Sequence, residues 1–162
     1  MSLLRRHLLL VAMAAAGLGL RAGPTPAAPS DDGDDQALLA DADYRAGLAA
    51  LKAGNPGSAL PRFQAALKRF PDAANLHNEL GYTHRKLRLF DKAFEHYKRA
   101  LSIDPRHRGA HEYIGEAYLE VGDPVGAERH LAALRSICVL PCDELNELTA
   151  AVDAYRARVG PR

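Results

Sequence analysis

Small, apolar and polar positions alternate along this chain in a pattern that repeats every 34 residues. The clearest marker is a glycine that stands at Gly47, Gly81 and Gly115. Three further series keep the same spacing: Ala59, Ala93 and Ala127; Phe63, Tyr97 and Leu131; and Ala66, Ala100 and Leu134. Because several series agree over three units, the chain is predicted to be an array of similar structural units.

Each unit is expected to be a pair of antiparallel helices. The alanine and the larger apolar residue four positions later share one face of a helix, and the small glycine lets a second helix approach closely. Turn residues separate the two helices, as in Gly54-Asn55-Pro56-Gly57 and Gly122-Asp123-Pro124. Pro71 and Pro105, also 34 positions apart, end the second helix. One pair cannot bury both of its faces, so neighbouring pairs are expected to stack.

These positions resemble the tetratricopeptide repeat, most completely in the second unit. The residues that carry the resemblance are Leu80-Gly81, His84, Ala93, Tyr97, Ala100 and Pro105. The resemblance implies an all-α fold, a right-handed α-solenoid of about three helix-turn-helix hairpins with a C-terminal capping helix. We place this domain at residues 40–158, with units at 40–73, 74–107 and 108–141 and the capping helix at 143–158. The end units depart from the pattern, with Asp43 and Ala50 in place of large aromatics and Val139 in place of the closing proline.

The first 22 residues have the order of a secretory signal peptide. Arg5 and Arg6 precede an apolar run from Leu8 to Leu20, and small residues follow. The run is shorter than the ~20 residues that span a bilayer, although an uncleaved anchor is the alternative. We predict cleavage after Ala22, with residues 16 and 28 as alternatives, and no stable membrane span afterwards. The paired arginines leave the general secretory and twin-arginine routes both open.

Residues 23–39 are predicted to be a disordered spacer rich in proline and aspartate. Calcium binding by its aspartates is the alternative, but their spacing lacks an EF-hand pattern. The preceding export signal predicts a periplasmic or secreted bacterial protein.

Charge changes the picture once the leader is removed. The whole chain has 21 basic and 20 acidic residues, a formal net charge of +1. Removing residues 1–28 takes away three arginines and no acid, so 18 − 20 leaves −2. This balance offers no basic surplus for nucleic acid, which we exclude as a partner.

No residue pattern supports catalysis, a cofactor or a metal site. The chain lacks a Gly-x-Ser-x-Gly elbow and a phosphate-binding loop. His111-Glu112 opens like a zinc-protease motif, but Gly115 stands where its second histidine belongs. His77 and His111, like His96 and His130, are one repeat apart and therefore roughly 10 Å or more from each other, so we do not expect them to share a metal.

Cys138 and Cys142 follow the second helix of the third unit. In an oxidising compartment we expect a structural disulfide, which stabilises such a short loop by about 2 kcal/mol at most. A redox role, a thiolate site for a soft metal such as Cu(I), and free thiols are the alternatives.

The resemblance also implies that the first helix of each unit lines a concave face that binds a protein or peptide. Carried onto this chain, the outward positions are Tyr44, Leu48, Asn78, Tyr82, Arg85, Lys86, Glu112, Glu116 and Glu120. An ordinary solvated face is the alternative. We therefore predict a non-enzymatic, exported interaction module or assembly scaffold, with self-association through the end helices left open. The second hypothesis is a periplasmic redox or metal-handling accessory that uses Cys138 and Cys142.

Overall fold

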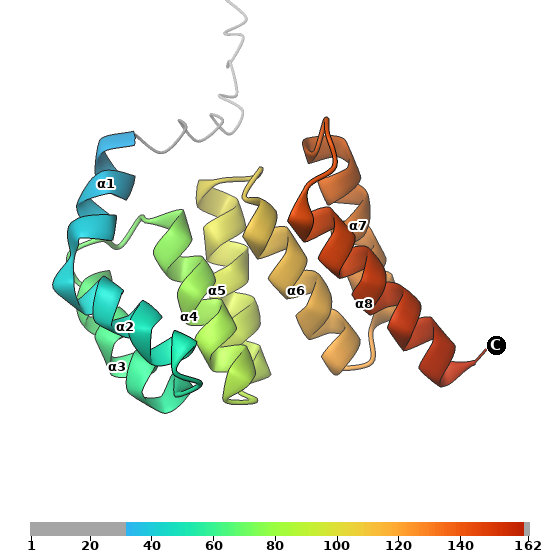
Figure 1. Ribbon diagram of the computed structural model, residues 1–162, viewed down its shortest axis with the longest axis horizontal. Coiled ribbons are helices and arrows are strands. Elements are labelled where there is room, and N and C mark those ends of the chain that lie inside the picture. Colours follow the sequence, from blue (N-terminus) through green and yellow to red (C-terminus); the bar gives the residue numbers. More distant parts are fainter. Residues whose placement is uncertain (1–31, 161–162) are drawn as a thin grey trace, which may run out of the picture.

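The computed structural model describes residues 32–160, which form eight α-helices and no strand within that range (Figure 1). The predicted signal peptide and the first part of the predicted spacer lie outside these residues. The helices are α1 (Asp32–Ala40), α2 (Ala42–Lys52), α3 (Pro56–Leu67), α4 (Ala74–Lys86), α5 (Phe90–Ile103), α6 (Arg108–Glu120), α7 (Pro124–Ile137) and α8 (Asp143–Val159). None of these helices is both long and apolar enough to cross a membrane.

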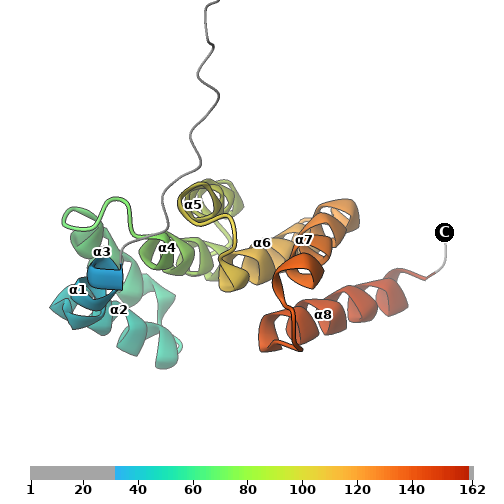
Figure 2. The same ribbon diagram turned by 90° about the horizontal axis from the view of Figure 1, so that it is seen from above.

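Three helix hairpins stack along the chain and a single helix closes the array. The hairpins are α2–α3, α4–α5 and α6–α7, and each packs on the next, while α8 packs against α6 and α7. Each predicted unit contains one hairpin. The predicted all-α solenoid with a C-terminal capping helix is confirmed. Figure 2 shows α4 and α6 set back between α2 and α8, so these four helices line a concave face.

The turns inside the hairpins explain where the second helices begin. Gly54 and Gly122 have φ angles of 71° and 82°, a left-handed conformation that glycine adopts without a Cβ penalty. The next residues, Asn55 and Asp123, cap α3 and α7 by accepting backbone N–H bonds at 3.0 and 2.9 Å. In the middle hairpin Arg88 takes the left-handed position instead, with a φ of 62°. That turn therefore lacks the glycine signal that marks the other two.

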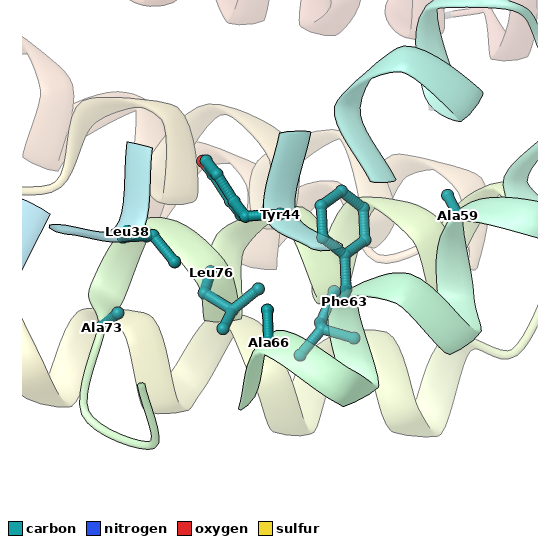
Figure 3. Packing of buried hydrophobic residues seen from close by; sticks show 8 residues of the cluster. Leu38, Tyr44, Ala59, Phe63, Ala66, Ala73 and Leu76 are labelled. Carbon is teal, nitrogen blue, oxygen red and sulfur yellow. The ribbon is translucent and has the colours of Figure 1, made fainter. Parts of the chain in front are cut away.

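The periodic glycines are points where two helices touch. A Cβ added to Gly81 would lie 2.5 Å from the ring of Tyr97, well inside contact distance. Gly47 meets the ring of Phe63 in the same way in the first hairpin. Both aromatic rings are fully buried, and Figure 3 shows Phe63 within the first core cluster. In the first two hairpins, the periodic glycine thus marks the point where the aromatic ring of the paired helix packs.

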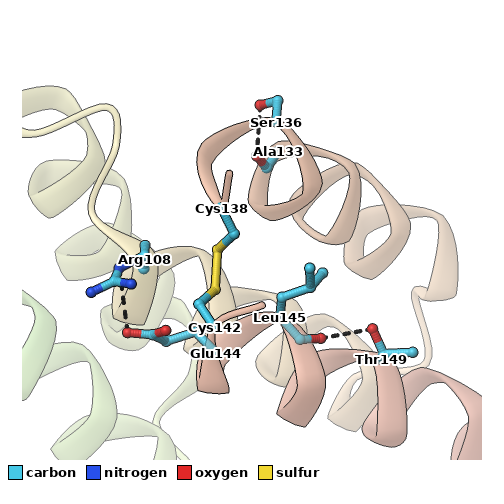
Figure 4. Close-up of a disulfide and its surroundings, with 8 residues drawn as sticks. All are labelled: Arg108, Ala133, Ser136, Cys138, Cys142, Glu144, Leu145 and Thr149. Atoms are coloured by element: carbon cyan, nitrogen blue, oxygen red, sulfur yellow. Dashed lines mark hydrogen bonds and ion pairs between the residues drawn. A yellow bond between two sulfur atoms is a disulfide. The ribbon is translucent and has the colours of Figure 1, made fainter. Parts of the chain in front are cut away.

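In the last hairpin, the periodic glycine packs against the capping helix α8 instead of against its paired helix. A Cβ on Gly115 would lie 2.7 Å from Leu148 of α8, and Leu148 and Val152 are almost completely buried. A disulfide joins Cys138, just after α7, to Cys142, just before α8 (Figure 4). The predicted disulfide is therefore present, and it fixes the short connection from which the capping helix begins.

The prediction of a disordered spacer up to residue 39 is wrong for its last part. Residues 32–40 form α1, and Leu38 is 1% exposed in the core that also holds Tyr44 and Leu76 (Figure 3). Asp35 accepts a hydrogen bond of 3.0 Å from the side-chain amide of Asn75. Leu38 covers the apolar end of the first hairpin, and this contact holds α1 in place. The acidic composition of residues 31–35 gives no indication of it.

Candidate functional site

A groove of about 450 Å³ lies on the concave face between the end of α4 and the second half of α8. The C-terminal turn of α6 lies between the two walls. The groove is lined by Arg85, Lys86, Arg88, Glu116, Leu119, Glu120, Ala151, Ala154, Tyr155 and Arg158. Its volume falls within the range of pockets that bind small molecules or a few side chains of a protein partner.

Arg85 is the fixed centre of this groove. Its guanidinium contacts Glu116 and Glu120 of α6, with both N–O distances at 2.7 Å. The Arg85 side chain is only 5% exposed, whereas Glu116 and Glu120 remain partly open to solvent. Arg88 reaches the second oxygen of Glu120 at 3.1 Å. Because paired glutamates neutralise the buried arginine, this part of the groove is rigid and close to charge balance.

Two exposed cations lie on opposite walls of the groove, and each is close to a tyrosine ring, of which only the Tyr155 ring lines the groove itself. Lys86 Nζ lies 5.0 Å from the centre of the Tyr82 ring on α4, and Arg158 Cζ lies 5.3 Å from that of Tyr155 on α8. Neither cation has an ion-pair partner among residues 32–160. Each is therefore held near an aromatic surface while its charge remains available to a ligand.

The other end of the concave face is acidic and partly protonated. Glu112, near the start of α6, is 4% exposed and shares a hydrogen bond with Glu147 of α8. Burial and that hydrogen bond raise the pKa of Glu112 to about 8. Burial alone raises the pKa of Glu79 on α4 to about 7. The concave face therefore runs from buried carboxyl groups at one end to exposed cations at the other.

The predicted outward positions do not all reach the surface. Tyr44, Asn78, Arg85 and Glu112 are buried, with 4–5% of each exposed, so the prediction that they point outward is wrong. Tyr44 packs 5.8 Å from Phe63 beneath α1.

Neighbouring helices explain the other buried positions. Asn78 is enclosed near Gly109 at the start of α6, and Glu112 is covered by α8. Lys86 and Glu120 are exposed, whereas Leu48, Tyr82 and Glu116 are partly buried. The three glutamates of α6 therefore lie in two environments: Glu116 and Glu120 both pair with Arg85, whereas Glu112 lies against Glu147 of α8.

Sequence reasoning missed the contribution of the capping helix to the groove. Tyr155 and Arg158 form one wall, although Tyr155 also continues the apolar stripe by which α8 packs, which consists of Leu145, Leu148 and Val152. The available signal in the sequence was that Tyr155 is the last residue of this stripe and lies next to the exposed end of the helix.

The cysteines and acids offer no metal cage in the part of the chain that the structure describes. No group of three or more histidine, cysteine, aspartate or glutamate side chains there could hold a metal ion. Both sulfur atoms belong to the disulfide, which lies beside the Arg108–Glu144 ion pair (Figure 4). Thiolate ligation would require this bond to be reduced first.

Comparison with known proteins identifies the first two hairpins of the array. Residues 44–107 match the family model of the tetratricopeptide repeat. The matched segment runs from α2 to the end of α5 and includes the α4 wall of the groove. No curated protein matches the chain.

Proposed function

We propose, since the chain belongs to the tetratricopeptide repeat family, that it is a non-enzymatic interaction module or assembly scaffold. Repeats of this family commonly mediate protein–protein interaction. The occupant of the α4–α8 groove is then a segment of a protein partner. This assignment rests on the groove rather than on the family alone, because a fold does not by itself specify a ligand.

The observation that carries the proposal is a groove with an exposed cation on each wall, Lys86 and Arg158, and the fixed Arg85 between them. Lys86 and Arg158 are exposed and free of ion-pair partners among residues 32–160, while Arg85 is already neutralised by two glutamates. A partner segment that carries a carboxylate next to an apolar side chain meets a cation on each wall and the Tyr155 ring on α8. Such aromatic and cationic anchors dominate the energetics of protein interfaces.

The proposed location is the bacterial periplasm or the exterior. It rests on the order of residues 1–22, which lie outside the described part of the chain, and a disulfide is compatible with such an oxidising compartment. The redox or metal-handling alternative at Cys138 and Cys142 stays a prediction, and no ligand cluster in residues 32–160 favours it.

Charge reversal on the two walls tests the binding face. Affinity capture would compare the wild-type chain with a Lys86→Glu/Arg158→Glu variant. The control is Lys68→Glu/Lys98→Glu. It makes the same charge change at two exposed positions, Lys68 just after α3 and Lys98 on α5. We expect the groove variant to lose partners that the control variant retains. If both variants retain the same partners, the groove is not the binding face.

A further inference from the structure

Two histidine pairs occupy equivalent positions in the second and third hairpins, and none of them lines the groove. His77 of α4 faces His96 of α5 with 3.1 Å between their Nδ1 atoms. His111 of α6 faces His130 of α7 with 2.9 Å between the same atoms. The two members of a pair are 19 residues apart in the sequence, so each pair links the two helices of one hairpin.

A backbone carbonyl fixes the proton of the first histidine in each pair. His77 Nε2 lies 3.0 Å from the carbonyl oxygen of Pro71, and His111 Nε2 lies 3.1 Å from that of Pro105. Because a carbonyl oxygen only accepts, Nε2 carries the hydrogen, and the Nδ1 lone pair of the neutral ring points toward the second histidine. The same N–H to carbonyl bond orients histidines that bind metals.

The distances within the pairs match two ligands on one ion. Imidazole nitrogens bound at ~2.0–2.1 Å are roughly 2.9–3.4 Å apart when the angle at the metal is roughly 90–110°. Both measured separations fall in this interval. His96 and His130 are partly exposed, which gives an ion access from solvent. Without an ion, the second histidine donates its Nδ1–H to the first. Binding requires that this proton move to Nε2 of the second histidine and that the two rings turn until both Nδ1 lone pairs point at the ion.

The first hairpin places a different pair at the same two positions. Asp43 and Arg62 precede His77 and His96 by 34 residues, and they form an ion pair of 3.2 Å. The hairpin scaffold therefore accepts either pair between its helices. This gives each histidine pair a replacement that the protein itself already uses.

We propose that His77–His96 and His111–His130 are two equivalent binding sites for a borderline divalent transition-metal ion. Imidazole is a preferred ligand for Zn²⁺, Cu²⁺ and Ni²⁺. Each site supplies two protein ligands. No third histidine, cysteine, aspartate or glutamate completes a metal-binding group with either pair within residues 32–160, so water completes the coordination. Binding is accordingly reversible, unlike that of a structural zinc site with four protein ligands.

The test uses the full chain, purified without a polyhistidine tag and freed of metal by a chelator. Calorimetric titration with ZnCl₂ at pH 7.5 is expected to show two ions bound per chain. With Cu²⁺ as the probe, electron paramagnetic resonance is expected to show coupling to two nitrogens. Absence of both signals in the wild-type protein overturns the proposal, whatever the variants do.

Matched variants assign the sites. His77→Asp/His96→Arg copies the pair of the first hairpin and is expected to remove one of the two ions. The equivalent change in the third hairpin is expected to remove the other, and the variant that combines both changes is expected to bind neither. Unchanged zinc stoichiometry in the combined variant, with helical circular dichroism retained, would overturn the assignment.

A ring that stacks on each pair supplies a further control. The ring of His84 lies 5.3 Å from that of His96, and the ring of Tyr118 lies 5.7 Å from that of His130 at the corresponding place. The His84→Tyr variant therefore copies the third hairpin, and we expect it to keep both ions. Loss of an ion in this variant would contradict a site made by two histidines alone.

Discussion

Replacing Glu112 by glutamine should stabilise the protein at neutral and alkaline pH. The pKa of Glu112 is raised from 4.5 to about 8, mainly by burial and secondly by a hydrogen bond to Glu147. Between these values the folded protein keeps a proton that the unfolded chain has lost. The contribution of this group to stability is therefore complete below pH 4.5 and is lost as the pH rises toward 8.

The size of the effect follows from the same shift. Each pKa unit corresponds to about 1.4 kcal/mol, so the interval from 4.5 to pH 7 sets an upper bound of about 3 kcal/mol. Because the proton is shared with Glu147, we expect a gain on the order of 2 kcal/mol for Glu112→Gln at pH 7. Glutamine keeps the shape of the side chain, and its amide N–H replaces the shared proton.

Urea unfolding followed by far-ultraviolet circular dichroism measures this gain at several pH values between 4.5 and 8.5. The difference between variant and wild type should be near zero at the acid end and grow with pH. The difference in unfolding free energy between variant and wild type is the quantity to compare, because other groups also titrate. Burial lowers the pKa of His96 and His130 to about 4, so the contribution of these histidines to stability rises with pH in both proteins. Glu95→Gln, an exposed change on α5, is the control. A variant that is less stable than wild type at pH 8 would refute the argument.

Two further predictions concern the hairpin contacts and the disulfide. Gly81→Ala should destabilise the protein by about 1–3 kcal/mol in urea unfolding, because its Cβ meets the Tyr97 ring. Gly57→Ala, whose Cβ would make only an ordinary contact of 3.7 Å with Asn55 Oδ1, should be neutral or stabilising, and equal effects of the two substitutions would contradict the contact at Gly81. Cys138→Ser/Cys142→Ser should lower the free energy of unfolding by about 2 kcal/mol or less, and a thermal midpoint equal to that of the oxidised protein would show that the disulfide adds no stability.

The fold was predictable because the glycine and ring positions record tertiary contacts directly. Gly81 and Tyr97 are separated by 16 positions in the sequence but touch in the structure, and Gly47 and Phe63 of the first unit repeat this arrangement. The helix α1 was not predictable in this way. Its buried residue Leu38 lies in an acidic segment and has no apolar counterpart one repeat away, where Asp72 stands.

The groove was only partly predictable, because its walls depend on the neighbours of each helix. Arg85 lines the groove, but the sequence could not reveal that it is buried and pairs with both Glu116 and Glu120. The histidine pairs were missed for a related reason. Comparison at the repeat spacing relates His77 to His111, whereas the contact that matters joins His77 to a residue on the second helix of the same unit.

Photocrosslinking tests the central claim, that the concave groove is the binding face, most directly. A photoreactive amino acid would replace Ala154, which lines the groove on α8, or Ala132, an exposed residue of α7 outside it. The account predicts covalent capture of a partner protein from position 154 and none from position 132. Capture from position 132 alone, or equally from both positions, would contradict it.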